Sequence, residues 1–333
     1  MGMQDFLNSY MGRYVVQSFV HSLTALAIVD IFMRLWKVEN PVIVQKFRFL
    51  VILHPVFSFP IYQLLCPARG GVSFRIYALF DSARWLNLTL GKSLQAGLLL
   101  IPLFLGTSLI LLFQEVIPMA RQWVRSKRNA YPVDTSPHNP VKSILNGLPA
   151  PKLDHYVIRD NNLVLFAKSG SRPTILLSQR LLRLLSYDQL KVALAHEVAH
   201  TIRNRHPFLI LIYLVRLLMF YNPVTLIAFR RAVSDEEKIC DDMAVSWTGK
   251  PQALADTLKM FYFKEDESRN KHADGLNLKS VTGYGHNLLI KSRVERLERE
   301  PDQQVSLPWL KFALTLLTIG ILNYYIVSLV SQR

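Results

Sequence analysis

The chain contains two histidines and a glutamate with the types and spacing of a catalytic zinc site. Residues 196–200 read HEVAH, which fits the pattern H-E-x-x-H. On a helix, His196 and His200 lie one turn apart and can bind one metal ion together, with Glu197 beside the metal. In this arrangement two neutral imidazoles bind Zn²⁺ and the glutamate acts as a general base in hydrolysis. The alternative is a solvated helix that carries two histidines by chance.

The residues before and within this motif predict the helix that it needs. Ser186 and Gln189 have the spacing of a capping box, a pattern that begins helices. Apolar residues then recur every four positions and form one face of the helix: Leu190, Leu194, Val198 and Ile202. Because His196 lies about 200° around the helix from Leu194, the histidines are expected to point away from this face.

A catalytic zinc site also needs a third protein ligand, and an acidic segment downstream offers one. Residues 234–244 read SDEEKICDDMA and are expected to form a helix that ends at Gly249. Glu237 falls on the inward face of this helix with Cys240 and Ala244. A carboxylate is costly to bury there unless it meets a cation, so we predict Glu237 as the third zinc ligand.

Other residues of this acidic helix have different predicted roles. Asp241, one turn after Glu237, is positioned to hold a zinc-binding histidine by its free ring N–H. Glu236 and Asp242 are predicted to be surface charges, and Cys240 a small buried residue rather than a ligand. The alternative is that the whole acidic segment is a solvated helix face.

The composition indicates a membrane protein. Hydrophobic residues make up 50% of the 333-residue chain and the formal net charge is +15. Apolar spans with basic flanks explain both values, and no nucleic-acid-binding motif is present. Four segments are long and apolar enough to cross a bilayer as helices: residues 14–36, 47–66, 94–118 and 306–329. The two cysteines support no disulfide framework, which favours a reducing compartment for the catalytic part.

Residues 207–230 are also apolar, but they lie between the two parts of the predicted zinc site. A single crossing would place His200 and Glu237 about 30 Å apart, on opposite sides of the membrane. Asn222-Pro223 breaks the segment into two shorter helices. We therefore predict a helical hairpin that is either re-entrant in the bilayer or lies at its interface.

A small β-sheet is expected before the HEVAH helix. Residues from about 130 to 150 are rich in Pro, Asn and Ser and predict a linker. Three short strands are predicted within residues 154–178, the first two joined by a hairpin turn at Asn161-Asn162. The strand over residues 163–168 is a candidate for pairing with an extended peptide substrate.

The motifs together resemble those of integral-membrane zinc metallopeptidases. HEVAH followed by EKICD about forty residues later is similar to the HtpX and CAAX-protease families and to the antirepressor peptidases of the BlaR/MecR type. The segment FYNPVTLIAFRRAVSDEEKICDD is most similar to the BlaR/MecR type. The resemblance implies that His196, His200 and Glu237 bind zinc, that Glu197 is the catalytic base, and that Asp241 supports a histidine.

The C-terminal part of the peptidase region adds further candidates, and one position departs from the family. His286 and Arg293 are similar to an H…R-I-x-x-L pattern. Tyr284 and His286 are candidates for stabilising the oxyanion, with a structural role as the alternative for His286. Family members often have an acidic residue shortly after the second histidine, whereas here Arg203 begins a basic run.

These observations predict a mostly α-helical membrane protein of three parts. Residues 1–128 form a three-helix transmembrane region, residues 129–305 a zinc metallopeptidase domain that includes the 207–230 hairpin, and residues 306–333 a fourth transmembrane helix. Basic residues after the third span place the peptidase domain in the cytoplasm. The resemblance implies a bacterial inner membrane.

The predicted activity is cleavage of a protein or peptide substrate at the cytoplasmic face by a zinc-dependent endopeptidase. Such an enzyme acts in signalling, by cleaving a repressor, or in membrane-protein quality control. The alternative is a non-catalytic signalling or scaffold protein that uses zinc only to stabilise its fold. The expected partners are the substrate and the lipid bilayer, and no nucleic acid is expected.

Overall fold

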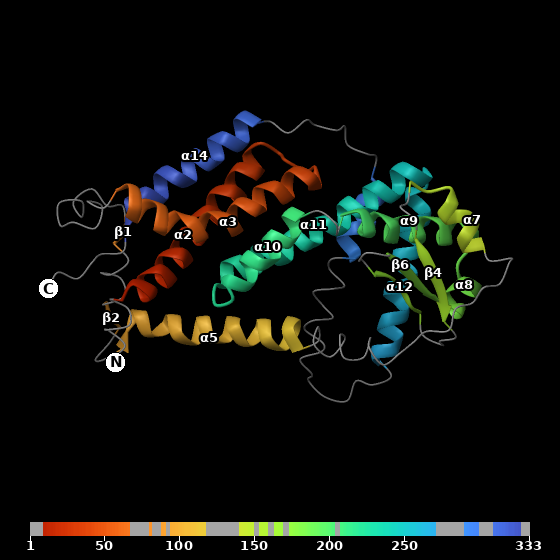
Figure 1. Cartoon of the computed structure of the whole chain (residues 1–333), viewed down its shortest axis with the longest axis horizontal. Helices are drawn as coiled ribbons and strands as arrows, with labels where there is room; N and C mark the ends of the chain where they lie inside the picture. Colours follow the sequence, from red (N-terminus) through yellow and green to blue (C-terminus); the bar gives the residue numbers. More distant parts are fainter. Residues whose placement is uncertain are drawn as a thin grey trace. The chain divides into compact units, whose positions relative to one another are not determined.

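The structure is a computed structural model of the chain (Figure 1). The residues that it describes are 9–66, 80–81, 88–90, 94–117, 140–149, 153–158, 163–168, 173–203, 207–270, 290–299 and 309–327. The chain forms two compact units. The first contains residues 1–128, 208–235 and 304–333, and the second contains residues 129–207 and 236–303.

Long apolar helices build the first unit. Its elements are α2 (Tyr10–Leu35), α3 (Pro41–Leu65), α5 (Leu100–Leu111), α10 (Pro207–Leu218), the first half of α11 (Pro223–Thr248) and α14 (Trp309–Tyr325). A 3₁₀ turn (Ala96–Leu99) and a π-helical turn (Leu112–Val116) extend α5 at its two ends. Two-residue strands complete the unit: β1 (Phe80–Asp81) pairs with β7 (Ile326–Val327), and β2 (Thr89–Leu90) pairs with β3 (Leu94–Gln95).

Three of these helices are long and apolar enough to cross a membrane: Tyr10–Leu35, Pro41–Leu65 and Ala96–Val116. They correspond to the first three predicted spans. The fourth predicted span corresponds to α14, which has 17 residues. A helix usually needs about 20 residues to cross the hydrocarbon core, so the fourth crossing stays a prediction.

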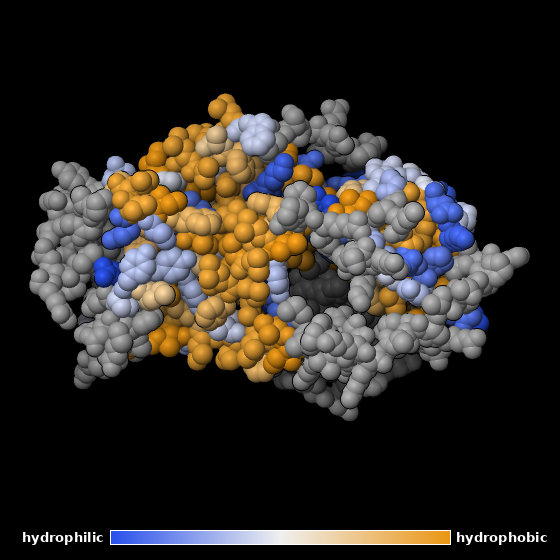
Figure 2. Space-filling model, in the orientation of Figure 1, coloured by the Kyte–Doolittle hydropathy of each residue, from blue (hydrophilic) through white to orange (hydrophobic). Residues whose placement is uncertain are grey.

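The first unit buries several polar residues within its hydrophobic core and exposes many apolar residues on its surface. Nδ1 of His21 in α2 lies 2.7 Å from the Ser58 hydroxyl in α3, and the Asn323 amide donates to the backbone carbonyl of His21 at 3.3 Å. On the surface, Leu64 and Leu310 are each more than 80% exposed, and hydrophobic residues cover most of the visible face of this unit (Figure 2). This distribution is typical of helices that pack in lipid.

Helices α10 and α11 form the predicted helical hairpin. The rings of Tyr213 and Phe229 lie 6.1 Å apart across it. The break at Asn222-Pro223 is confirmed, because α11 begins at Pro223 and the Asn222 side chain accepts a hydrogen bond from the Val224 N–H at 3.0 Å.

The second arm of the hairpin is not the short helix that we expected. Helix α11 runs for 26 residues to Thr248, since no Gly or Pro interrupts residues 224–248. It ends before Gly249, whose φ of 67° is the left-handed conformation that ends helices. The same helix therefore carries the second arm of the hairpin and the acidic segment with Glu237.

A three-stranded sheet begins the second unit. Its strands are β4 (Asp154–Ile158), β5 (Leu165–Lys168) and β6 (Thr174–Ser178), in the order β4-β6-β5. The prediction of a hairpin at Asn161-Asn162 is wrong, because β4 pairs in parallel with β6 and not with β5. The central position goes to the strand with the most buried residues: Ile175, Leu176 and Leu177 are at most 5% exposed.

Together with the second half of α11, further helices share a hydrophobic core with this sheet. They are α7 (Pro140–Asn146), α8 (Gln179–Leu184), α9 (Tyr187–Arg203), α12 (Pro251–Asn270) and a helix over residues 290–297. The prediction of a linker up to residue 150 is wrong at α7. Val141, Ile144 and Leu145 have helical spacing there and are buried in the hydrophobic core of the unit.

Helix α9 begins as predicted. The Ser186 N–H donates to the Gln189 side chain at 3.0 Å, and the Gln189 N–H donates to the Ser186 hydroxyl at 3.3 Å. Three of the four residues of its apolar face are buried: Leu190, Leu194 and Val198. The fourth, Ile202, is 36% exposed in the last turn.

Candidate metal centre

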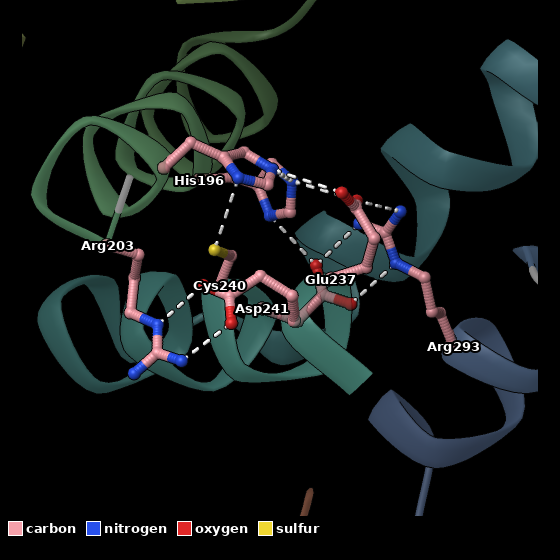
Figure 3. Close-up of polar contacts among 8 residues, drawn as sticks. His196, Arg203, Glu237, Cys240, Asp241 and Arg293 are labelled. Atoms are coloured by element: carbon pink, nitrogen blue, oxygen red, sulfur yellow. Dashed lines mark hydrogen bonds and ion pairs between the residues drawn. The ribbon is translucent and has the colours of Figure 1, made fainter. Parts of the chain in front are cut away.

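Helices α9 and α11 bring His196, His200 and Glu237 together (Figure 3). The Nε2 atoms of the two histidines lie 3.1 Å apart. Glu237 Oε1 lies 3.3 Å from His200 Nε2, and Glu237 Oε2 lies 3.6 Å from His196 Nε2. Two imidazole nitrogens and a carboxylate therefore face one small space.

The geometry and chemistry of this donor set fit a zinc ion. Zinc binds His nitrogen and carboxylate oxygen at about 2.1 Å, so the ligand atoms of a tetrahedral site lie about 3.4 Å apart, close to the observed spacing. Two histidines with one carboxylate also leave the fourth position free for water, as in catalytic sites. His196, His200 and Glu237 are thus the residues that could hold the metal.

Asp241 lies behind the first histidine. Its Oδ1 is 3.0 Å from His196 Nδ1, and its side chain is 1% exposed. A carboxylate at Nδ1 favours the proton on that nitrogen and leaves the Nε2 lone pair available for a metal. The structure thus places Asp241 beside a ring nitrogen of His196, and its role in holding a zinc-binding histidine stays a prediction.

Neighbouring charges and hydrogen bonds together outweigh burial in setting the pKa values of these groups. Burial lowers the pKa of His196, but the carboxylates of Asp241 and Glu237 raise it more, to about 9. Burial acts to raise the pKa values of Glu237 and Asp241, yet both are lowered overall by the histidines and by Arg293. The centre thus concentrates negative charge where a divalent cation would bind.

Arg293 holds the two carboxylates in place, a role that the sequence did not predict. Its Nε and one terminal nitrogen each donate to Asp241 at 2.7 Å, and its other terminal nitrogen donates to Glu237 at 2.9 Å. Both partners sit on α11, one turn apart, and the Arg293 side chain is 11% exposed. The H…R-I-x-x-L pattern pointed to Arg293 but not to these contacts. His286 and Tyr284 lie outside the described residues.

The prediction that Glu236 is a surface charge is wrong. Its carboxylate accepts two hydrogen bonds of 2.6 Å from the guanidinium of Arg203, and the residue is 9% exposed. Arg203 is the basic residue that departs from the family pattern, and here it joins the end of α9 to α11. The Asp242 side chain is 44% exposed, and its carboxylate lies 2.6 Å from the guanidinium of Arg296.

Glu197 lies on α9 between the two histidines and is half-buried. Among the described residues, none forms a hydrogen bond or ion pair with its carboxylate. An unpaired carboxylate next to the histidine pair can accept a proton from a water molecule at the centre.

Replacing Arg293 with Met is expected to lower the free energy of unfolding of the second unit by about 3 kcal/mol, because Asp241 and Glu237 lose their cation. Added zinc should restore part of this loss by compensating the Glu237 charge. Thermal unfolding of the purified protein, with chelator and with zinc, measures both effects.

Arg296→Met is the matched control for this variant. Arg296 pairs with Asp242, and both side chains are about one third exposed or more. Removal of such a pair is expected to cost less than about 1 kcal/mol. Equal destabilisation by the two substitutions would contradict the assigned role of Arg293.

A comparison with protein families gives a match over the segment that carries this site. No curated protein matches the chain. Residues 168–260, which include HEVAH and Glu237, match the family model described as BlaR1 peptidase M56. The segment that carries the candidate metal centre is therefore similar to the BlaR/MecR type of membrane metallopeptidase.

Proposed function

We propose that this chain is a membrane-embedded, zinc-dependent endopeptidase that cleaves a protein substrate at the cytoplasmic face of a bacterial inner membrane. One observation carries the proposal. His196, His200 and Glu237 converge within 4.8 Å inside a segment that matches a peptidase family, and Glu197 lies between the histidines without a partner among the described residues.

In the proposed mechanism, residues of α9 and α11, together with Arg293, have separate roles. Zinc, when bound, supplies the Lewis acidity that activates water and polarises the scissile carbonyl. Glu197 takes a proton from the attacking water and delivers it to the leaving amine. Asp241 keeps the His196 ring in the tautomer that presents Nε2, and Arg293 keeps Glu237 and Asp241 ionised.

The edge of β5 is the proposed binding site for an extended substrate. Strand β5 lies at one edge of the sheet, and within the described residues no strand pairs with its other side. The Ser178 N–H donates to the Val164 carbonyl at 2.9 Å, so Val164 faces β6. Because backbone direction alternates along a strand, the N–H and C=O groups of Leu165 and Ala167 face outward and can pair with a peptide.

Replacing Ala167 with Pro is expected to lower kcat/KM for a protein substrate roughly threefold to tenfold, because it removes one outward N–H without breaking the pairing with β6. Zinc content should not change. Ala167→Val keeps the N–H and is the control. Unchanged kinetics in the proline variant, measured on casein, would exclude substrate pairing at this position.

The membrane and signalling parts of the proposal have separate support. The three long apolar helices and the apolar surface of the first unit support insertion in a bilayer, and the α10–α11 hairpin is proposed to be re-entrant or interfacial. Arg121, Arg125, Lys127 and Arg128 follow the third span and favour a cytoplasmic peptidase. The family match favours signalling by repressor cleavage over quality control.

Casein cleavage by the full chain in detergent tests the proposed activity against the non-catalytic alternative. The proposal expects cleavage that stops when a chelator removes the metal and returns when zinc is added. A scaffold that uses zinc only for its fold would bind zinc and unfold at a lower temperature with chelator. It would cleave nothing under either condition.

A further inference from the structure

We propose that Cys240 positions His200 at the metal centre by accepting a hydrogen bond from its ring N–H, in the same way that the Asp241 carboxylate lies against the ring of His196. This inference rests on the proposed zinc site. It assigns Cys240 as a positioning residue and not as a ligand.

The contact that carries the inference is on the far side of the His200 ring from the centre. Cys240 Sγ lies 3.4 Å from His200 Nδ1. The atoms that face Glu237 and the other histidine are the Nε2 atoms, 3.1 Å apart. If Nε2 presents its lone pair to a metal, Nδ1 carries the proton and sulfur is the acceptor. Figure 3 shows the Cys240 sulfur pointing from α11 toward the imidazoles.

Each of the two histidines then has an outer partner, and the two partners occupy consecutive positions of one helix. Asp241 lies 3.0 Å from Nδ1 of His196, and Cys240 lies 3.4 Å from Nδ1 of His200. Glu237 is three and four residues earlier, so all three side chains project from one face of α11. One helical turn thereby supplies a metal-facing carboxylate and an outer partner for each imidazole.

The chemistry of the two supports differs. Asp241 is a buried carboxylate that also binds Arg293, whereas Cys240 is fully buried and provides a weak, uncharged acceptor. A second carboxylate at position 240 would add another buried negative charge beside Glu236, Glu237 and Asp241. A thiol fixes the orientation of the His200 ring without that charge.

The test measures the zinc affinity of the full-length protein in detergent, by competition with a chromophoric chelator. Cys240→Ala and Cys240→Val remove the acceptor and are expected to weaken zinc binding about 10- to 100-fold. Cys240→Ser keeps an acceptor and is expected to stay within about threefold of the unchanged protein. Cys66→Ala, at the end of α3, is the control for loss of a thiol and should not alter the affinity.

Replacing zinc with cobalt shows whether Cys240 supports His200 or binds the metal itself. The expected spectrum of the unchanged protein has visible d–d bands but no thiolate-to-cobalt charge-transfer band in the near ultraviolet. Such a band, lost in Cys240→Ala, would overturn the proposal by making Cys240 a ligand. The presence of the band is read on the unchanged protein, and the variant only assigns the band to Cys240.

The other results of these measurements also decide whether Cys240 positions His200. Zinc affinity in the Ala and Val variants equal to that of the unchanged protein would overturn the positioning role and leave the proposed peptidase intact. A serine variant as weak as the alanine variant would assign the effect to packing and overturn it too. An unchanged protein that binds neither metal would refute the proposed function together with this inference.

Discussion

Replacing Glu197 with Gln is expected to lower the rate of casein cleavage about 10²- to 10⁴-fold, the usual contribution of a general base, while zinc stays bound. The amide keeps the size of the side chain but cannot take a proton from water. His196, His200 and Glu237 are unchanged, so the metal content should remain one zinc per chain. Cleavage rate and zinc content measured on the same sample separate the two effects.

Glu295→Gln is the matched control for this variant. Glu295 is a half-exposed glutamate whose contact with Lys291, one turn before it, is 3.9 Å long. The control is expected to keep the full cleavage rate. Undiminished proteolysis by Glu197→Gln would show that another group acts as the base, and loss of zinc in that variant would show that Glu197 also supports the site.

Replacing Glu237 with Gln is expected to weaken zinc binding by more than the roughly 10- to 100-fold that loss of an outer partner costs, because it removes a charged ligand. Cleavage should fall with the zinc content. The amide also weakens the contact with Arg293, which lies 2.9 Å from the Glu237 carboxylate. Zinc titration followed by fluorescence or dye competition gives the affinity.

The neighbouring Glu236→Gln variant shows whether position on the helix or negative charge alone decides the effect. Glu236 binds Arg203 with two hydrogen bonds of 2.6 Å and is not part of the His196–His200–Glu237 cluster. It is expected to lower the unfolding temperature and leave the zinc affinity close to that of the unchanged protein. Equal loss of zinc in the two variants would reject Glu237 as a specific ligand.

Local patterns predicted the elements of the centre. The capping box at Ser186 and Gln189 depends on contacts three residues apart, and the spacing of His196 and His200 depends on one helical turn. Such relations are fixed by helix geometry alone, so they can be read from the sequence. Glu237 could be placed because a carboxylate on an inward helical face demands a cation.

Long-range contacts decided the features that the sequence did not predict. Arg293 meets Asp241 across 52 residues of chain, and no periodicity tells which cation a buried carboxylate will meet. Glu236 was assigned to the surface because its burial depends on Arg203 from another helix. The contact of Cys240 with His200 likewise depends on how α9 and α11 pack.

Turn and composition signals failed where tertiary packing overrode them. Asn161-Asn162 can form a tight turn, but it does not determine which strand takes the centre of the sheet, and β6 takes it. The Pro, Asn and Ser content before residue 150 indicated a linker, although three apolar residues of α7 in this segment are buried in the core. For α11, an expected boundary near residue 230 had no Gly or Pro to enforce it.

Zinc-edge X-ray absorption on the purified full-length protein tests the central claim most directly. The account predicts one zinc per chain, bound by nitrogen and oxygen atoms only, with the multiple-scattering signature of two imidazoles. That signature should weaken to one imidazole in His200→Ala. A zinc-loaded sample with sulfur ligands, or with fewer than two imidazoles in the unchanged protein, would contradict the account.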